Sequence, residues 1–200
     1  DVDSTERFVT SWTFLILVEA LSAILKNRPA ALSSDQRSSL DEVETFLKKN
    51  YGSVNLDFKK AFPSGGLKLD GFDLAPAVLG NQIGGIRAAR QDASGLGNTL
   101  VRVCDWLSAH LERLGSACPH VLILFDELDL GFDPSNAQYV DRVVGLLLAS
   151  RLFTIRFSRK GVNVHPIIFL RSDIFDGLHF GDKNKIVNSE TIELLWHDRL

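Results

Sequence analysis

One stretch of nine residues constrains the fold more than any other, because five apolar residues run directly into a group of acidic ones. Residues 121–125 read Val-Leu-Ile-Leu-Phe, and Asp126, Glu127 and Asp129 follow within four positions. A short continuous apolar run predicts a strand buried on both faces, as in a parallel sheet covered by helices. In open α/β sheets, ligands bind just beyond the carboxyl ends of the strands. The stretch therefore places carboxylates where such a fold carries its chemistry.

A second apolar run ends in a comparable way. Residues 166–170 are followed by Arg171, Ser172 and Asp173, and the segment before them, about 137–157, has apolar residues at helical spacing. A strand, a crossing helix and a second strand form a βαβ unit, in which the two strands are parallel. We therefore expect the polar groups after the second strand to lie beside the acidic pair that follows the first.

The rest of the chain is mostly helical in pattern. Apolar periodicity predicts helices over about 8–25, 33–50 and 98–114, and a last helix that starts at Ser189. Residues 63–98 hold many glycines, and we interpret them as an insertion of loops and short elements within a single core that spans the chain.

Composition excludes several classes of protein. The chain is 45% hydrophobic and 24% charged, with a formal net charge of -3, so no overall basic field attracts nucleic acid. Cys104 and Cys118 have neither metal-ligand spacing nor a disulfide framework, which favours a cytoplasmic protein with Cys104 as a buried thiol. Residues 13–25 are too short to span a bilayer and include Glu19, so they predict a buried helix and no membrane contact.

With both strands in place, residues 98–200 resemble the second half of a bacterial P-loop ATPase core of the AAA- or STAND-like kind. The resemblance rests on residues 124–129, on 168–175, and on 182–186 followed by 193–196. It implies an α/β fold with a three-layer parallel sheet flanked by helices, incomplete at both ends of this chain. It also implies an ATP-binding and ATP-hydrolysing switch or motor. Many ATPases of this kind act in phage defence or in DNA-linked processes.

The resemblance also implies roles for four residues. Asp126 would hold Mg²⁺ beside the phosphates of ATP, and Glu127 would orient and deprotonate the attacking water. Arg171 or Ser172 would act as the sensor of the γ-phosphate, and an arginine there could stabilise transition-state charge. Each role has a plainer alternative. The acidic pair could be a helix cap and first turn, Arg171 could form a structural ion pair, and Asp173 could be the N-cap of the next turn.

The main departure from the family pattern is the missing phosphate-binding loop. No Gly-x-x-x-x-Gly-Lys-Ser/Thr occurs, and the nearest string, residues 95–99, has Asn98 at the lysine position and follows no buried strand. We expect the loop to lie upstream of residue 1. The alternative is a non-hydrolysing P-loop-like scaffold that acts by binding a protein, a second copy or a nucleic acid. Nucleic-acid binding would rest on Arg87, Arg90 and the basic residues within 151–160.

Overall fold

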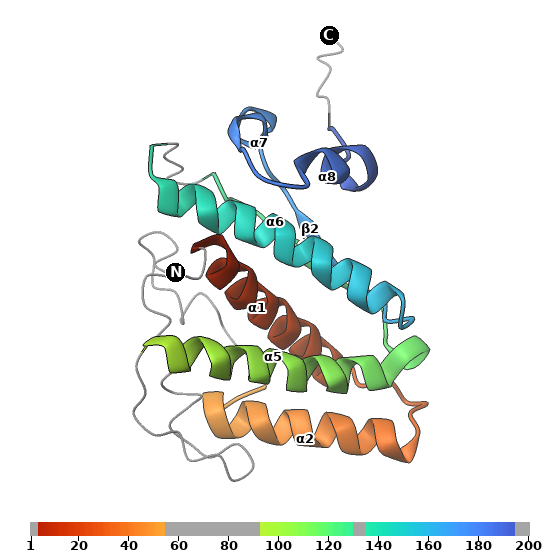
Figure 1. Cartoon of the computed structure of the whole chain (residues 1–200). Coiled ribbons are helices and arrows are strands. Elements are labelled where there is room, and N and C mark those ends of the chain that lie inside the picture. The colour runs from red at the N-terminus through yellow and green to blue at the C-terminus, as the bar shows by residue number, and fades with distance from the viewer. Residues whose placement is uncertain (1–3, 55–92, 130–134, 195–200) are drawn as a thin grey trace.

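Helices dominate the computed structural model, which describes residues 4–54, 93–129 and 135–194 (Figure 1). Four of the helices are long: α1 (Ser4–Lys26), α2 (Ser34–Tyr51), α5 (Ala93–Leu114) and α6 (Ala137–Ser158). The shorter elements are the 3₁₀ turn η1 (Gly115–Ala117), the strands β1 (Val121–Phe125) and β2 (Val164–Ile168), and the helices α7 (Ser172–Gly177) and α8 (Lys183–Glu190).

Helix α1 lies at the centre, between α5 and α6 (Figure 1). Its apolar residues form the middle of the core, and Ile16, Leu17 and Leu21 are fully buried. The helix is longer than the sequence suggested, and Thr5–Lys26 is apolar and long enough to cross a membrane by length and composition alone. Its packing against α5, α6 and β1 explains that apolar character as the character of a core helix.

The predicted βαβ unit is confirmed. Strands β1 and β2 pair in parallel, with Val121 opposite Val164 and Phe125 opposite Ile168, and α6 connects them. The bounds of β1 are those expected, whereas β2 begins and ends two residues earlier than expected. The two strands therefore end at the same edge of the sheet.

The predicted three-layer fold is wrong. Within the described residues the sheet has two strands and not the broad parallel sheet expected, and α1 and α6 pack on one face of it. The other face is exposed: 61% of Leu122 and 59% of Leu124 are accessible to solvent. A continuous apolar run does not distinguish a strand buried on one face from a strand buried on both, and this is why the sequence misled.

The contact between α2 and α5 is organised by the start of α2. Ser33 caps the helix by accepting a 3.3 Å hydrogen bond from the backbone N–H of Gln36, and the Oε1 atom of Gln36 accepts from the Ser33 N–H. The Nε2 atom of Gln36 then donates to the carbonyls of Arg113 and Leu114, at 3.2 and 3.1 Å. One side chain thus closes the start of α2 and satisfies carbonyls at the end of α5.

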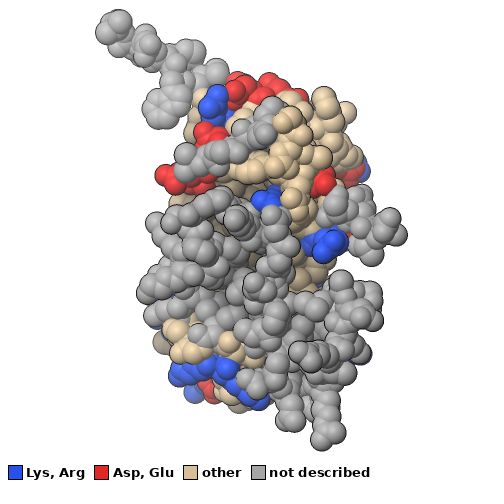
Figure 2. Space-filling model, turned by 90° about the vertical axis from the view of Figure 1, so that its left-hand side faces the viewer, with Lys and Arg blue, Asp and Glu red and all other residues tan. Residues whose placement is uncertain are grey.

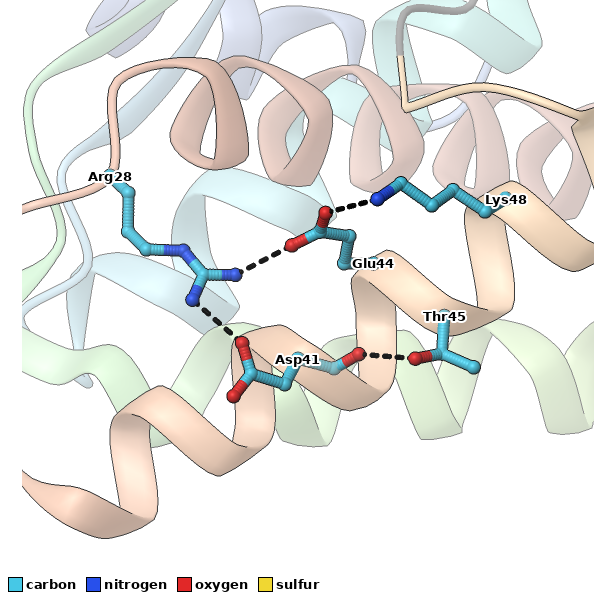
Figure 3. A network of polar contacts seen from close by, with 5 residues as sticks. All are labelled: Arg28, Asp41, Glu44, Thr45 and Lys48. Atoms are coloured by element: carbon cyan, nitrogen blue, oxygen red, sulfur yellow. Dashed lines mark hydrogen bonds and ion pairs between the residues drawn. The ribbon is translucent and has the colours of Figure 1, made fainter.

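An exposed network of ion pairs joins the segment after α1 to α2 (Figure 3). Arg28 donates to Asp41 at 2.6 Å and to Glu44 at 2.9 Å, and Glu44 also accepts from Lys48 at 2.6 Å. Exposed pairs of this kind contribute about 0.2–1 kcal/mol each. The network orients the loop more than it stabilises the fold.

The carboxyl-terminal part differs from expectation. Residues 183–190 form α8, whereas the sequence predicted a last helix that starts only at Ser189. Ile192, which the sequence placed in the last helix, lies beyond the end of α8 and is 86% exposed. The helix expected from residue 98 begins at Ala93, so the last residues of the predicted insertion belong to α5. The remainder of that insertion, from 63 to 92, lies outside the described residues.

Candidate functional site

The acidic pair lies directly beyond the end of β1. Asp126 and Glu127 are both exposed, and the adjacent end of β2 is held beside them by a 2.8 Å hydrogen bond from the Phe169 N–H to the Phe125 carbonyl. Arg171 and Ser172 follow two residues later, at the start of α7. The parallel strands therefore bring the predicted residues to one edge, which we call the carboxyl edge and define as residues 126–129 and 171–173.

The backbone at Glu127 has an unusual conformation. Its φ angle is +59°, in the left-handed region that residues other than glycine rarely adopt. The Oδ1 atom of Asp126 accepts a 2.8 Å hydrogen bond from the Glu127 N–H and so closes the turn. A left-handed residue other than glycine costs about 1–2 kcal/mol. Such strain is concentrated at functional sites, where the structure holds a side chain in a required position.

Arg171 forms ion pairs with two carboxylates at this edge. Its guanidinium donates to both oxygens of Asp173, at 3.1 and 2.7 Å, and lies 3.8 Å from Asp129. The hydrogen bond from Arg171 lowers the pKa of Asp173. The ion pair that the sequence raised as an alternative therefore exists, and it ties the end of β1 to the start of α7.

Asp173 is not the N-cap of α7. That position belongs to Arg171, which makes no capping hydrogen bond through its side chain, and Asp173 lies in the first turn. Ser172 is exposed and is the first residue of the helix. Ser172 thus lies at the carboxyl edge, and its role as a sensor stays a prediction.

Tyr139 is a residue that the sequence analysis missed. Its Oη atom donates a 2.8 Å hydrogen bond to the Leu128 carbonyl, and its own N–H is bound by the side chain of Asn136, the N-cap of α6. Burial raises the pKa of the Tyr139 phenol, so this group remains a donor. The start of a crossing helix in a βαβ unit lies near the carboxyl ends of the strands, and this rule could have identified Tyr139.

The charge of the carboxyl edge is predominantly negative. The edge as defined holds four carboxylates, those of Asp126, Glu127, Asp129 and Asp173, and one guanidinium, that of Arg171, which pairs with Asp129 and Asp173. Figure 2 shows acidic side chains gathered at the same end of the molecule, where α7 and α8 lie in Figure 1. A phosphate group would be repelled here unless a cation accompanied it.

The described residues do not form a metal site by themselves. They include no group of three or more His, Cys, Asp or Glu side chains placed to hold an ion. They do fit Mg²⁺ of the kind that is bound through one carboxylate, with phosphate oxygens and water as the other ligands. Asp126 is the residue that fits this role, because it is exposed and follows the strand directly.

Two of the four basic residues within 151–160, Arg151 and Arg156, form ion pairs with neighbouring helices. Arg151 forms an ion pair with Glu190 of α8, and Arg156 donates to Glu112 of α5 at 2.6 Å. These pairs join helices to one another, so they weaken the argument for a nucleic-acid surface on α6. Arg87 and Arg90, the other residues of that hypothesis, lie outside the described residues.

Comparisons of this chain with models of known protein families, with curated proteins and with solved structures find no match.

Proposed function

We propose that the carboxyl edge is the Mg²⁺-dependent nucleotide site of an ATP-hydrolysing switch or motor domain. The observation that carries the proposal is the strained turn after β1, which presents the exposed carboxylates of Asp126 and Glu127 next to Arg171 and Ser172. Asp126 supplies a ligand for Mg²⁺, and Mg²⁺ would neutralise charge on the phosphates.

The residues of the carboxyl edge have separate roles in hydrolysis. Glu127 accepts the proton of the attacking water, for which a carboxylate within reach of one water is sufficient. Arg171 and Ser172 contact the terminal phosphate, and the ion pairs of Arg171 with Asp173 and Asp129 fix the position of its guanidinium. Among the described residues of the carboxyl edge, Arg171 is the cation available to the phosphates.

Electrostatics provides a sharp test of the role of Asp126. If Asp126 only repels phosphate, Asp126→Asn should strengthen ATP binding. If Asp126 holds Mg²⁺, the same change should weaken Mg²⁺-dependent binding, and EDTA should abolish binding to the parent. Asp176→Asn is the matched control, because Asp176 is an exposed acid of α7 outside the carboxyl edge. We expect that control to leave binding unchanged.

The measurement of turnover completes the test. Glu127→Gln should abolish ATP hydrolysis and leave Mg²⁺-ATP binding largely intact, because the amide cannot accept the proton of the water. Parent-rate hydrolysis by both the Glu127→Gln and the Asp126→Asn variants would rule out the assignment. A parent protein with neither binding nor turnover would support the alternative, a non-hydrolysing scaffold that acts through protein contacts. The scarcity of positive charge among the described residues of the edge favours that alternative.

A further inference from the structure

The acidic turn after β1, residues 126–129, is fixed by hydrogen bonds at two points. The Phe125 carbonyl accepts a 2.8 Å hydrogen bond from the Phe169 N–H, just beyond the end of β2. The Leu128 carbonyl accepts a 2.8 Å hydrogen bond from the Oη atom of Tyr139 in α6. Asp126 and Glu127 are the two residues between Phe125 and Leu128, so the backbone has little freedom in how it joins the two fixed carbonyls.

Glu127, between those two points, has a strained backbone. Its φ angle of +59° lies in the left-handed region, and the hydrogen bond from its N–H to the Asp126 carboxylate closes the turn at 2.8 Å. A residue other than glycine keeps such a conformation only where the surrounding structure over-determines it. The contacts around the turn therefore include one that opposes its relaxation.

Three contacts hold the far end of the acidic turn, and they differ in what they fix. The side chain of Leu128 is partly buried against the core, which fixes its depth but not the direction of its backbone. The ion pair of Asp129 with Arg171 is 3.8 Å long and its guanidinium is exposed, so it contributes little. The hydrogen bond from Tyr139 fixes both the position and the direction of the Leu128 carbonyl.

Tyr139 is itself held in place from two sides. Its N–H donates a 3.2 Å hydrogen bond to the side chain of Asn136, the N-cap of α6. Its side chain is partly buried against a small apolar cluster that includes Val143 and Val144 of the same helix. A donor fixed by a helix in this way can impose a conformation on the turn that it binds, whereas a mobile donor would follow the turn.

We propose that Tyr139 is the positioning residue of the acidic turn, and that its hydrogen bond to the Leu128 carbonyl holds Glu127 in the left-handed conformation that presents its carboxylate at the carboxyl edge. This hold on the backbone does not depend on a nucleotide. Its consequence for turnover rests on the proposed function, because a general base acts only where it is placed within reach of the attacking water.

Urea unfolding tests the hold on the backbone. Glu127→Gly should unfold at a higher urea concentration than Glu127→Ala, because glycine adopts a positive φ angle without strain. Tyr139→Phe retains the ring and removes the donor, so the turn can relax. In that background the difference between the two urea midpoints should shrink by at least about half.

The matched control for this comparison is Tyr51→Phe, which makes the same chemical change in α2. In the Tyr51→Phe background the difference between the glycine and alanine midpoints should equal that in the parent. An undiminished difference in the Tyr139→Phe background would overturn the proposal. The absence of any difference in the parent would also overturn it, because the turn would then relax with Tyr139 in place.

Steady-state hydrolysis of Mg²⁺-ATP tests the consequence for turnover. Tyr139→Phe should lower kcat at least about tenfold and leave KM within about twofold, because Glu127 is displaced while Asp126 still adjoins the fixed end of β1. Tyr51→Phe should match the parent in both constants. A parent-like kcat for Tyr139→Phe would overturn the positioning role. An inactive parent would instead rule out the proposed function, and the urea comparison would still decide the role of Tyr139.

Discussion

The Oγ atom of Ser39 lies 2.7 Å from the Nδ1 atom of His110, inside the contact between α2 and α5. Both residues are buried. The ring of Trp106 packs edge-on against His110, with 4.2 Å between the ring centroids, and the Glu42 carboxylate lies 3.7 Å from the Nε2 atom. A buried histidine thus joins two helices through a neutral hydrogen bond.

This arrangement predicts a loss of stability in acid. Burial, and next the positive charge of Arg113, lower the pKa of His110 below its ordinary value of 6.5, and Glu42 and Ser39 oppose that shift. Below pH 6.5 the unfolded chain binds a proton at this histidine that the folded chain does not yet bind, so the free energy of unfolding falls as the pH falls. The free energy of unfolding falls by at most about 1.4 kcal/mol per pH unit through this histidine. Well above pH 6.5 the histidine is neutral in both states, and the pH dependence vanishes.

Chemical denaturation at about pH 7.5 and about pH 5.5 measures this effect. The His110→Gln variant should lose less stability between the two conditions than the parent, because only the parent carries the titrating group. Equal losses would assign the acid sensitivity to other groups.

Gly145 sets how closely α6 approaches α1. A Cβ atom at this position would lie 2.6 Å from the Cβ of Phe8 and 3.3 Å from the backbone nitrogen of Val9. Gly145→Ala should destabilise the fold by about 1–3 kcal/mol, despite the better helix propensity of alanine. Gly177→Ala is the control, because a Cβ there would meet no atom within 4 Å, and it should be neutral or slightly stabilising. Urea unfolding of the two variants makes the comparison.

Trp12 connects three elements of the core. Its Nε1 atom donates a 2.9 Å hydrogen bond to the Arg142 carbonyl of α6, and its ring meets that of Phe125 in β1 edge-on at 5.8 Å. Trp12→Ala should cost about 3–5 kcal/mol of stability. Trp12→Phe retains a ring and should cost only about 1–2 kcal/mol, mainly through the lost hydrogen bond. Thermal unfolding would contradict this description if the two variants were equally unstable.

The left-handed backbone of Glu127 allows the effect of a substitution on stability to be separated from its effect on activity. Glu127→Gly and Glu127→Ala both remove the carboxylate, and both should abolish ATP hydrolysis under the proposed function. The glycine variant should be more stable than the alanine variant by about 1 kcal/mol, because only glycine adopts this φ angle without strain. Equal stability of the two variants would show that the turn relaxes.

The local pattern of the sequence predicted several elements well. The apolar run at 121–125 has the bounds of β1, and the periodicity near 137–157 matches α6 closely. The parallel pairing of β1 and β2 also followed from the pattern, because a crossing helix returns the chain to the same end of the sheet. Cys104 is buried, as its place on an apolar helix face indicated, and burial raises its pKa to about 12.

Contacts between distant residues could not be predicted in this way. The link from Gln36 to the carbonyls that end α5 joins positions more than seventy residues apart, and no periodicity encodes it. The same holds for the hydrogen bond of Tyr139 to the Leu128 carbonyl and for the ion pair of Arg171 with Asp129. Each depends on how the helices are placed on the sheet.

What the sequence by itself determined is the type and order of most elements and the meeting of polar groups at the carboxyl edge. Both follow from periodicity and from the short reach of the chain between neighbouring elements. Only the tertiary structure decided which apolar surfaces are covered. Leu122 and Leu124 read as core residues along the chain, yet they face solvent, because α1 and α6 both pack on the other face of the sheet. Burial depends on the positions of all the elements at once, and local patterns do not carry that information.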